Sequence, residues 1–213
     1  SRQDADDFVL WATLGIVLGG RLGYVLFYKA GYYFANPTQI YAVWQGGMSF
    51  HGGLVGMIVS IIAFARLRKL SILSLGDRVA CVVPIGLFFG RLANFVNGEL
   101  YGRATSVSWG VVFPGGGPHP RHPSQIYEAL LEGLALYLLL FALSRSEQLR
   151  ARPGFLAGTF LIGYAAFRTV AELFREPDTH LGFIVGGVTM GQLLCLPMLL
   201  VGIVLVLRAA HRP

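Results

Sequence analysis

Six long apolar segments, three of which carry an arginine, constrain this chain more than any other feature of its sequence. A helix needs about 20 predominantly apolar residues to cross the hydrocarbon core of a bilayer, and each segment has that length or nearly so. The segments lie at about 8–28, 52–67, 79–97, 123–143, 155–174 and 188–207. We therefore predict an all-α, polytopic transmembrane helix bundle of about six spans. Residues 1–213 are expected to form a single integral-membrane domain.

The composition argues against a soluble protein. Residues of the AVILMFWYC class make up 54% of the chain and charged residues 13%, against roughly 45–50% and about 25% in soluble domains. The formal net charge of +6 does not indicate a nucleic-acid partner, because that requires basic residues clustered on a water-exposed face. Cys81 and Cys195 both lie in apolar segments, which is typical of buried thiols.

Three glycines predict a tight helix–helix contact in the first segment. Gly15, Gly19 and Gly23 recur every four residues, so they share one face of a helix. Small residues at this spacing let two helix backbones approach closely in lipid. We interpret this face as a packing seam.

The basic residues outside the spans are divided unevenly between the two sides of the membrane. Of the 17 lysines and arginines, ten lie on the side of the N-terminus, four on the opposite side and three within spans. The positive-inside rule makes the richer side cytoplasmic, and the C-terminus lies on that side too. Loops 29–51, 98–122 and 175–187 should then face outward. The second of these is rich in glycine and proline, and both a lid or docking surface and a flexible connector remain open for it.

The three arginines within spans are predicted to share one depth. Arg21, Arg91 and Arg168 each lie six or seven residues from the outer end of their span, which places them roughly 9–10 Å below the outer surface at 1.5 Å per residue. Charged residues inside a membrane usually face a cavity and serve function. Because guanidinium binds phosphate through a planar fork, Arg91 and Arg168 predict a site for an anionic headgroup. For Arg21 a structural role is an equal alternative.

Acidic residues enter the spans at the same level. Glu128 and Glu132 are one helical turn apart, and Glu172 lies four residues beyond Arg168 on the same helix face. These glutamates are candidate partners of the arginines. The sequence does not determine which acid pairs with which arginine.

His51 stands at the start of the second apolar segment, in the sequence MSFHGGLVG. The positive end of the helix dipole disfavours imidazolium, which leaves a neutral ring able to accept a proton. We interpret His51 as a candidate general base, with a structural, hydrogen-bonded histidine as the alternative. No HExxH pattern or cysteine ligand set accompanies the histidines, so neither a metal nor another cofactor is expected.

The stretch 90–102 reads GRLANFVNGELYG. It resembles, over its whole length, the signature GRx(G/A)NF-aliphatic-NxExxG of the bacterial prolipoprotein diacylglyceryl transferase family. Other pieces agree in order, including GGMSFHGGLVG at 46–56, RHPSQIYEALLEG at 121–133, FLIGYAAFR at 160–168 and ELFREPD at 172–178. The resemblance covers nearly all of the chain.

The resemblance implies a seven-span enzyme of the bacterial inner membrane, of which this chain would lack the first N-terminal span. Such an enzyme transfers the diacylglyceryl group of phosphatidylglycerol to the lipobox cysteine thiol of a preprolipoprotein and releases glycerol phosphate. Its partners would be phosphatidylglycerol, the signal-peptide and lipobox region and membrane lipids, with the active site toward the periplasm. The implied catalytic residues are His51, Arg91 and Arg168. The implied substrate-binding residues are Arg91, Asn94, Glu99, Gly102, Tyr164, Arg168 and Glu172.

A transporter of anionic lipids or solutes is the alternative function, because buried arginines would also bind a passing anion. Transporters often contain internal repeats or broken helices at matched positions. The sequence shows no such repeat.

Overall fold

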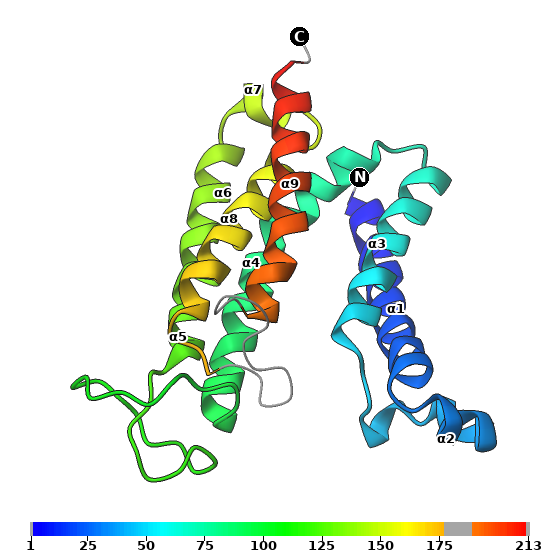
Figure 1. Ribbon diagram of the computed structural model, residues 1–213. Coiled ribbons are helices and arrows are strands. Elements are labelled where there is room, and N and C mark those ends of the chain that lie inside the picture. The colour runs from blue at the N-terminus through cyan, green and yellow to red at the C-terminus, as the bar shows by residue number, and fades with distance from the viewer. Residues whose placement is uncertain (1, 177–188, 212–213) are drawn as a thin grey trace. The chain divides into compact units, whose positions relative to one another are not determined.

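The computed structural model describes residues 2–176 and 189–211, which form helices and their connections with no β-strand (Figure 1). The chain divides into two compact units, residues 1–75 and 76–213. The expected single domain stays a prediction. The outward loop predicted at 175–187 lies mostly outside the described residues.

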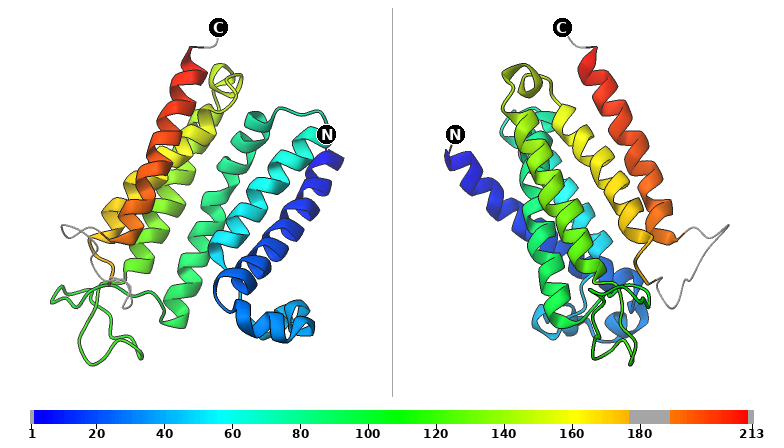
Figure 2. Two further views of the ribbon diagram at one scale, coloured as in Figure 1. Left: turned by 45° about the vertical axis from the view of Figure 1, so that its right-hand side comes forward. Right: turned by 90° about the vertical axis from the view of Figure 1, so that its left-hand side faces the viewer.

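The first unit is built on α1 (Arg2–Phe27) and α3 (Phe50–Leu67), which lie side by side in Figures 1 and 2. The short helices α2 (Ala30–Ala35), η1 (Pro37–Tyr41) and η2 (Val43–Gln45) connect them. The predicted glycine seam is confirmed. A Cβ added to Gly19 would lie 2.9 Å from the Cα atom of Gly56, and one added to Gly23 would lie 2.8 Å from the Cα atom of Gly52.

The second unit contains the remaining long helices. α4 (Ile72–Asn97) begins at the end of the first unit. α5 (Ser124–Glu128), the π-helix η3 (Ala129–Ala135) and α6 (Leu136–Ser144) follow one another without a break. After α7 (Glu147–Arg150) come α8 (Phe155–Glu172) and α9 (Met190–Ala210), which pack side by side in both views of Figure 2.

The helices confirm a multi-spanning membrane protein. Among the described residues, five helical stretches are long and apolar enough to cross a bilayer: Gln3–Phe27, Phe50–Leu67, Ile72–Asn97, Ser124–Ser144 and Met190–Ala210. α8 is not one of them, so the sixth span stays a prediction. Its sequence includes both Arg168 and Glu172, which lower its hydropathy. Large apolar side chains on α9 are exposed, including Leu200 at 65%, as expected of a surface solvated by lipid.

A buried carboxylate ties α4 to α8 at the end of α8 remote from Arg168. Asp77 of α4 accepts two backbone hydrogen bonds, from the N–H groups of Gly154 and Ala157, each at 2.7 Å. A carboxylate is favourable at a helix N-terminus because it satisfies orphan donors and complements the dipole. Asp77 therefore fixes the position of α8 along α4, and these are the helices that carry the two predicted catalytic arginines.

Candidate functional site

Three arginines and three glutamates of the second unit form one ionic cluster. Its members are Arg91 of α4, Glu128 of α5, Glu132 of η3, Arg168 and Glu172 of α8, and Arg175, which follows α8. Glu128 and Glu132 are completely buried, whereas the side chains of Arg91 and Arg168 are 17% and 12% exposed.

Glu128 is the centre of this cluster. Its Oε2 atom lies 2.9 Å from Nε of Arg91 and 2.8 Å from Nη1 of Arg168. Its Oε1 atom lies 3.5 Å from Nη1 of Arg175. The two contacts to Oε2 have the length of strong charge-assisted hydrogen bonds, whereas the contact to Oε1 is longer. Arg91 and Arg168 therefore meet at one oxygen, and the common depth predicted for Arg21, Arg91 and Arg168 stays a prediction.

Glu132 is held more loosely. Its closest cationic atoms are Nη2 of Arg91 at 3.5 Å and Nη1 of Arg168 at 3.7 Å, both longer than an ordinary hydrogen bond. Neither of its carboxylate oxygens accepts a hydrogen bond from a described residue. The two glutamates that the sequence places one turn apart therefore have different environments.

The local backbone explains how both glutamates reach the cluster. In an α-helix, residues four apart are offset by about 40° around the axis. The π-helical turn of η3 is wider, and this reduces the offset between Glu128 and Glu132. Gly133 also brings η3 against α4, because a Cβ added there would lie 2.6 Å from Cβ of Phe88. Phe88 is three residues from Arg91, so this close approach occurs beside the ionic cluster.

Glu172 connects the cluster to the start of α9. Its Oε2 atom lies 2.9 Å from Nη2 of Arg168, as their spacing of four residues predicted. Its Oε1 atom accepts a hydrogen bond of 3.0 Å from the Thr189 hydroxyl, and Thr189 is the N-cap of α9. A Cβ added to Gly191 would lie 2.9 Å from the same oxygen. Glu172 thus positions Arg168, and its role in binding substrate stays a prediction.

The loop 98–122 is tied to the chain that follows α8. The N–H of Gly102 donates to the carbonyl of His122 at 2.9 Å, and the N–H of Arg103 donates to the carbonyl of Phe174 at 2.9 Å. A Cβ added to Gly102 would lie 2.6 Å from that His122 carbonyl oxygen. Arg121 donates to the carbonyl of Gly102 at 3.2 Å. These contacts favour a folded loop, in which Gly102 allows two backbone segments to cross.

The other predicted substrate-binding residues lie on, or just after, helices that carry members of the cluster. Asn94 is half-buried on α4, three residues after Arg91, and its carbonyl accepts the N–H of Glu99 at 2.9 Å. The carboxylate of Glu99 is exposed and accepts a hydrogen bond from Asn97 at 2.8 Å. Tyr164 lies four residues before Arg168 on α8 and packs against an apolar core cluster formed by Leu136, Leu140 and Leu156.

Arg21 belongs to the first unit and has a structural environment. Its side chain donates to four backbone carbonyls, those of Gln39 at 2.6 Å, Ile40 at 2.8 Å, Gly46 at 2.6 Å and Gly47 at 3.1 Å. Its guanidinium also lies 5.0 Å from the centroid of the Tyr33 ring. Arg21 is only 4% exposed. Of the two alternatives that the sequence left open, these contacts favour a structural role.

His51 also lies in the first unit, as the second residue of α3. The hydroxyl of Ser49 caps this helix by accepting the N–H of Gly52 at 3.2 Å. The imidazole is exposed and makes an edge contact with Phe50, with 5.7 Å between ring centroids. His51 therefore lies in the first turn of a helix, where the sequence placed it, and its role as a base stays a prediction.

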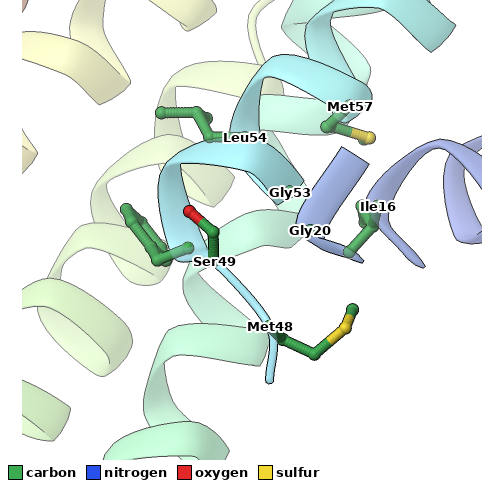
Figure 3. A pocket seen from close by; sticks show the side chains of 8 residues that line it. Ile16, Gly20, Met48, Ser49, Gly53, Leu54 and Met57 are labelled. Carbon is green, nitrogen blue, oxygen red and sulfur yellow. The ribbon is translucent and has the colours of Figure 1, made fainter. Parts of the chain in front are cut away.

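An apolar cavity of about 370 Å³ lies beside this cap, between α1 and α3 (Figure 3). Its lining residues are Ile16, Gly20, Met48, Ser49, Phe50, Gly53, Leu54 and Met57. Ser49 supplies the one hydroxyl group among them. The cavity lacks the charged groups that would hold a headgroup.

Comparison with known proteins gives these contacts their context. Residues 1–208 match the family described as prolipoprotein diacylglyceryl transferase. The chain belongs to this family. The phosphatidylglycerol–prolipoprotein diacylglyceryl transferase of Paramagnetospirillum magneticum is 61% identical over 98% of this chain and 78% of its own length. Enzymes of the same name from Rhodospirillum rubrum and Azospirillum brasilense are 60% and 56% identical, over 96% and 100% of this chain and 75% and 80% of their own lengths.

Sequence reasoning treated Glu128 and Glu132 only as candidate partners of the arginines, and it did not place Arg175 in the site. The two glutamates were recognisable as acids near a span end, and both fall in the RHPSQIYEALLEG piece of the family resemblance. Arg175 was counted as a loop residue because it follows the sixth apolar segment. Its contact with Glu128 depends on the turn that the chain makes after α8, which the sequence does not reveal.

Proposed function

We propose that this chain transfers the diacylglyceryl group of phosphatidylglycerol to the lipobox cysteine thiol of a preprolipoprotein and releases glycerol phosphate. Membership of the family makes it a transferase of lipoprotein biosynthesis. The names of its relatives supply the two substrates. The structural observation that supports the proposal best is the convergence on Glu128 of Arg91, from the family signature, and Arg168.

Arg91 and Arg168 are proposed to bind the phosphodiester of the lipid. In the reaction the cysteine sulfur attacks the glycerol carbon that bears the phosphate, a C–S bond forms, and the C–O bond to phosphate breaks. Negative charge then increases on the departing phosphate oxygen. Fixed cationic donors in a site of low dielectric stabilise such charge strongly. Asn94 and Glu99 would orient the headgroup from the same end of α4.

His51 is proposed to accept the thiol proton, directly or through water. A thiolate is the reactive form of cysteine, and the nucleophile here belongs to the substrate protein. Both cysteines of this chain lie on helices of the second unit, and neither is needed for the reaction. The base assignment is tested by His51→Gln. We expect its turnover to fall at every pH, and near-normal turnover at high pH would contradict the assignment.

The site is proposed to face the periplasm from the bacterial inner membrane. The excess of basic residues in the loops on the other side supports this orientation, which also makes the C-terminus cytoplasmic. Preprolipoproteins emerge on the periplasmic side, so the lipobox would meet the lipid at that face.

The function is tested by incubating the purified protein with labelled phosphatidylglycerol and a lipobox peptide. We expect label to become covalently attached to the peptide, and we expect Arg91→Ala to insert into membranes but to lose transfer. Movement of lipid without attachment would instead indicate a transporter. Full activity of Arg91→Ala would contradict the phosphate-binding role.

A further inference from the structure

The charge of the ionic cluster is unsuited to an anionic ligand as it stands. Arg91 and Arg168, the two proposed phosphate ligands, already face two fully buried carboxylates, those of Glu128 and Glu132. A phosphodiester would bring one further negative charge. Burying an uncompensated charge is costly. Binding is therefore favoured if one carboxylate becomes neutral.

The three carboxylates differ in how well their negative charge is stabilised. Glu128 is contacted by three arginines, and Glu172 pairs with Arg168 and accepts the Thr189 hydroxyl. Glu132 is fully buried, and both of its oxygens lack a hydrogen bond from the described residues. The negative charge of Glu132 is thus the least stabilised of the three carboxylate charges.

The titratable and charged groups around Glu132 come from several helices. They are Arg91 of α4, Glu128 of α5, Arg168 and Tyr164 of α8, and Cys195 of α9. The two arginines favour the ionised carboxylate, although both are shared with Glu128 at shorter distances. The nearby charge of Glu128 favours the neutral form. A bound phosphate would contact the same two arginines, and their electrostatic stabilisation of the Glu132 carboxylate would then be weaker still.

We propose that phosphatidylglycerol binds to the form of the enzyme in which Glu132 is protonated, so that headgroup binding is linked to one proton. The proposal rests on the proposed function and extends it. Protonation of Glu132 removes one negative charge beside Arg91 and Arg168, and the phosphodiester brings one negative charge to the same two arginines. Glu132 is thereby a positioning and charge-compensating residue, which acts through Arg91 and Arg168.

The test is the pH dependence of KM for phosphatidylglycerol in mixed micelles, with kcat followed in parallel between about pH 6 and 9. When only the protonated form binds, KM rises in inverse proportion to the population of that form. The KM of the wild-type enzyme should therefore increase up to about tenfold per pH unit above the midpoint for Glu132. Glu132→Gln carries a permanently neutral amide of the same shape. Its KM should be flat, and below the wild-type KM at pH 9.

Two further variants sharpen the comparison. Glu147→Gln removes a carboxylate that is 92% exposed, and it should keep the wild-type KM profile. Glu132→Asp keeps a titrating group, and it should keep a pH-dependent KM. Proton transfer from the thiol is part of the chemical step and affects kcat, so a change confined to KM is distinct from it.

Two results would overturn the inference. One is a wild-type KM that does not change with pH while covalent transfer is readily measured. The other is a Glu132→Gln variant that retains the wild-type slope. If Glu132→Gln does not fold, the wild-type KM profile alone decides. An enzyme that transfers no lipid at any pH contradicts the proposed function instead, so the two failures are distinct.

Discussion

Replacing Arg168 by lysine tests whether the site needs the guanidinium fork or only its positive charge. Arg168 uses two nitrogens for two carboxylates, with Nη1 at 2.8 Å from Glu128 and Nη2 at 2.9 Å from Glu172. These acids belong to different helices, α5 and α8. A lysine carries its charge on one compact ammonium group, so we expect it to keep the contact with one carboxylate and lose the other.

The structure sets the expected magnitude. Losing one hydrogen bond between charged groups costs about 1.5–3 kcal/mol of folding free energy. In the reaction, losing one donor to the developing negative charge typically costs about 2.7–4 kcal/mol of transition-state stabilisation, which corresponds to about 10²–10³-fold in kcat. Arg168→Lys should therefore still fold in the membrane but transfer lipid about 10²–10³-fold more slowly.

The assay is turnover of labelled phosphatidylglycerol with a lipobox peptide, together with the midpoint of denaturation in detergent. Arg150→Lys is the matched control, because Arg150 is 54% exposed and lies 3.8 Å from Glu147. An exposed change of this kind should alter stability by less than about 0.5 kcal/mol. If Arg168→Lys retained more than about a third of wild-type turnover, positive charge alone would suffice. The claim that the reaction needs the two-pronged guanidinium group of Arg168 would then be refuted.

Three other substitutions follow from the packing. Asp77→Asn should destabilise the second unit by about 1–3 kcal/mol, measured by denaturation in detergent. The N–H groups of Gly154 and Ala157 donate to different oxygens of Asp77, and in asparagine one of these oxygens is replaced by an NH2 group, which cannot accept. Gly133→Ala should lower both stability and turnover, by about 1–3 kcal/mol in stability, because its methyl group collides with Phe88. Arg21→Lys should speed limited proteolysis within residues 36–48 in reconstituted membranes, because an ammonium cannot reach all four carbonyls that Arg21 binds.

The fold was largely predictable because membrane insertion imposes strong rules on sequence. Each of the six predicted apolar segments corresponds to helix in the described residues, since backbone groups in lipid must be satisfied within the segment. The glycine spacing likewise predicted a close helix–helix contact on the first segment, and the structure shows that its partner is α3. The helix ends were less accurate: α1 begins at Arg2, six residues before the predicted apolar segment. The difference arises because the polar residues before the apolar segment are also helical, although they lie outside the apolar stretch that the prediction used.

The pairing inside the site was less predictable, because it depends on how helices distant in sequence are set against each other. The spacing of Arg168 and Glu172 gave their pair directly, since both lie on one α-helix. The preference of Arg91 for Glu128 over Glu132 required the π-helical turn of η3 and the contact at Gly133. Apolar periodicity does not distinguish a π-helical turn from an α-helical one. Asp77 was missed for a related reason, because its partners are backbone groups 77 and 80 residues away.

The balance of charge within the cluster explains how arginines can be kept inside a membrane protein and still be available to a lipid phosphate. Unpaired arginines at this depth would oppose insertion by about 2.5–3.5 kcal/mol each at the span centre. Arginines whose N–H groups were all hydrogen-bonded to glutamates would have no donor left for the substrate phosphate. Glu128 and Glu172 hold Arg168 through short contacts, whereas Glu132 faces Arg91 and Arg168 only beyond hydrogen-bond distance. The loosely held carboxylate is thus the one that a phosphate can replace without dismantling the site. For this reason we expect substitutions at Glu128 to damage folding and activity together, and substitutions at Glu132 to change mainly the affinity for the lipid.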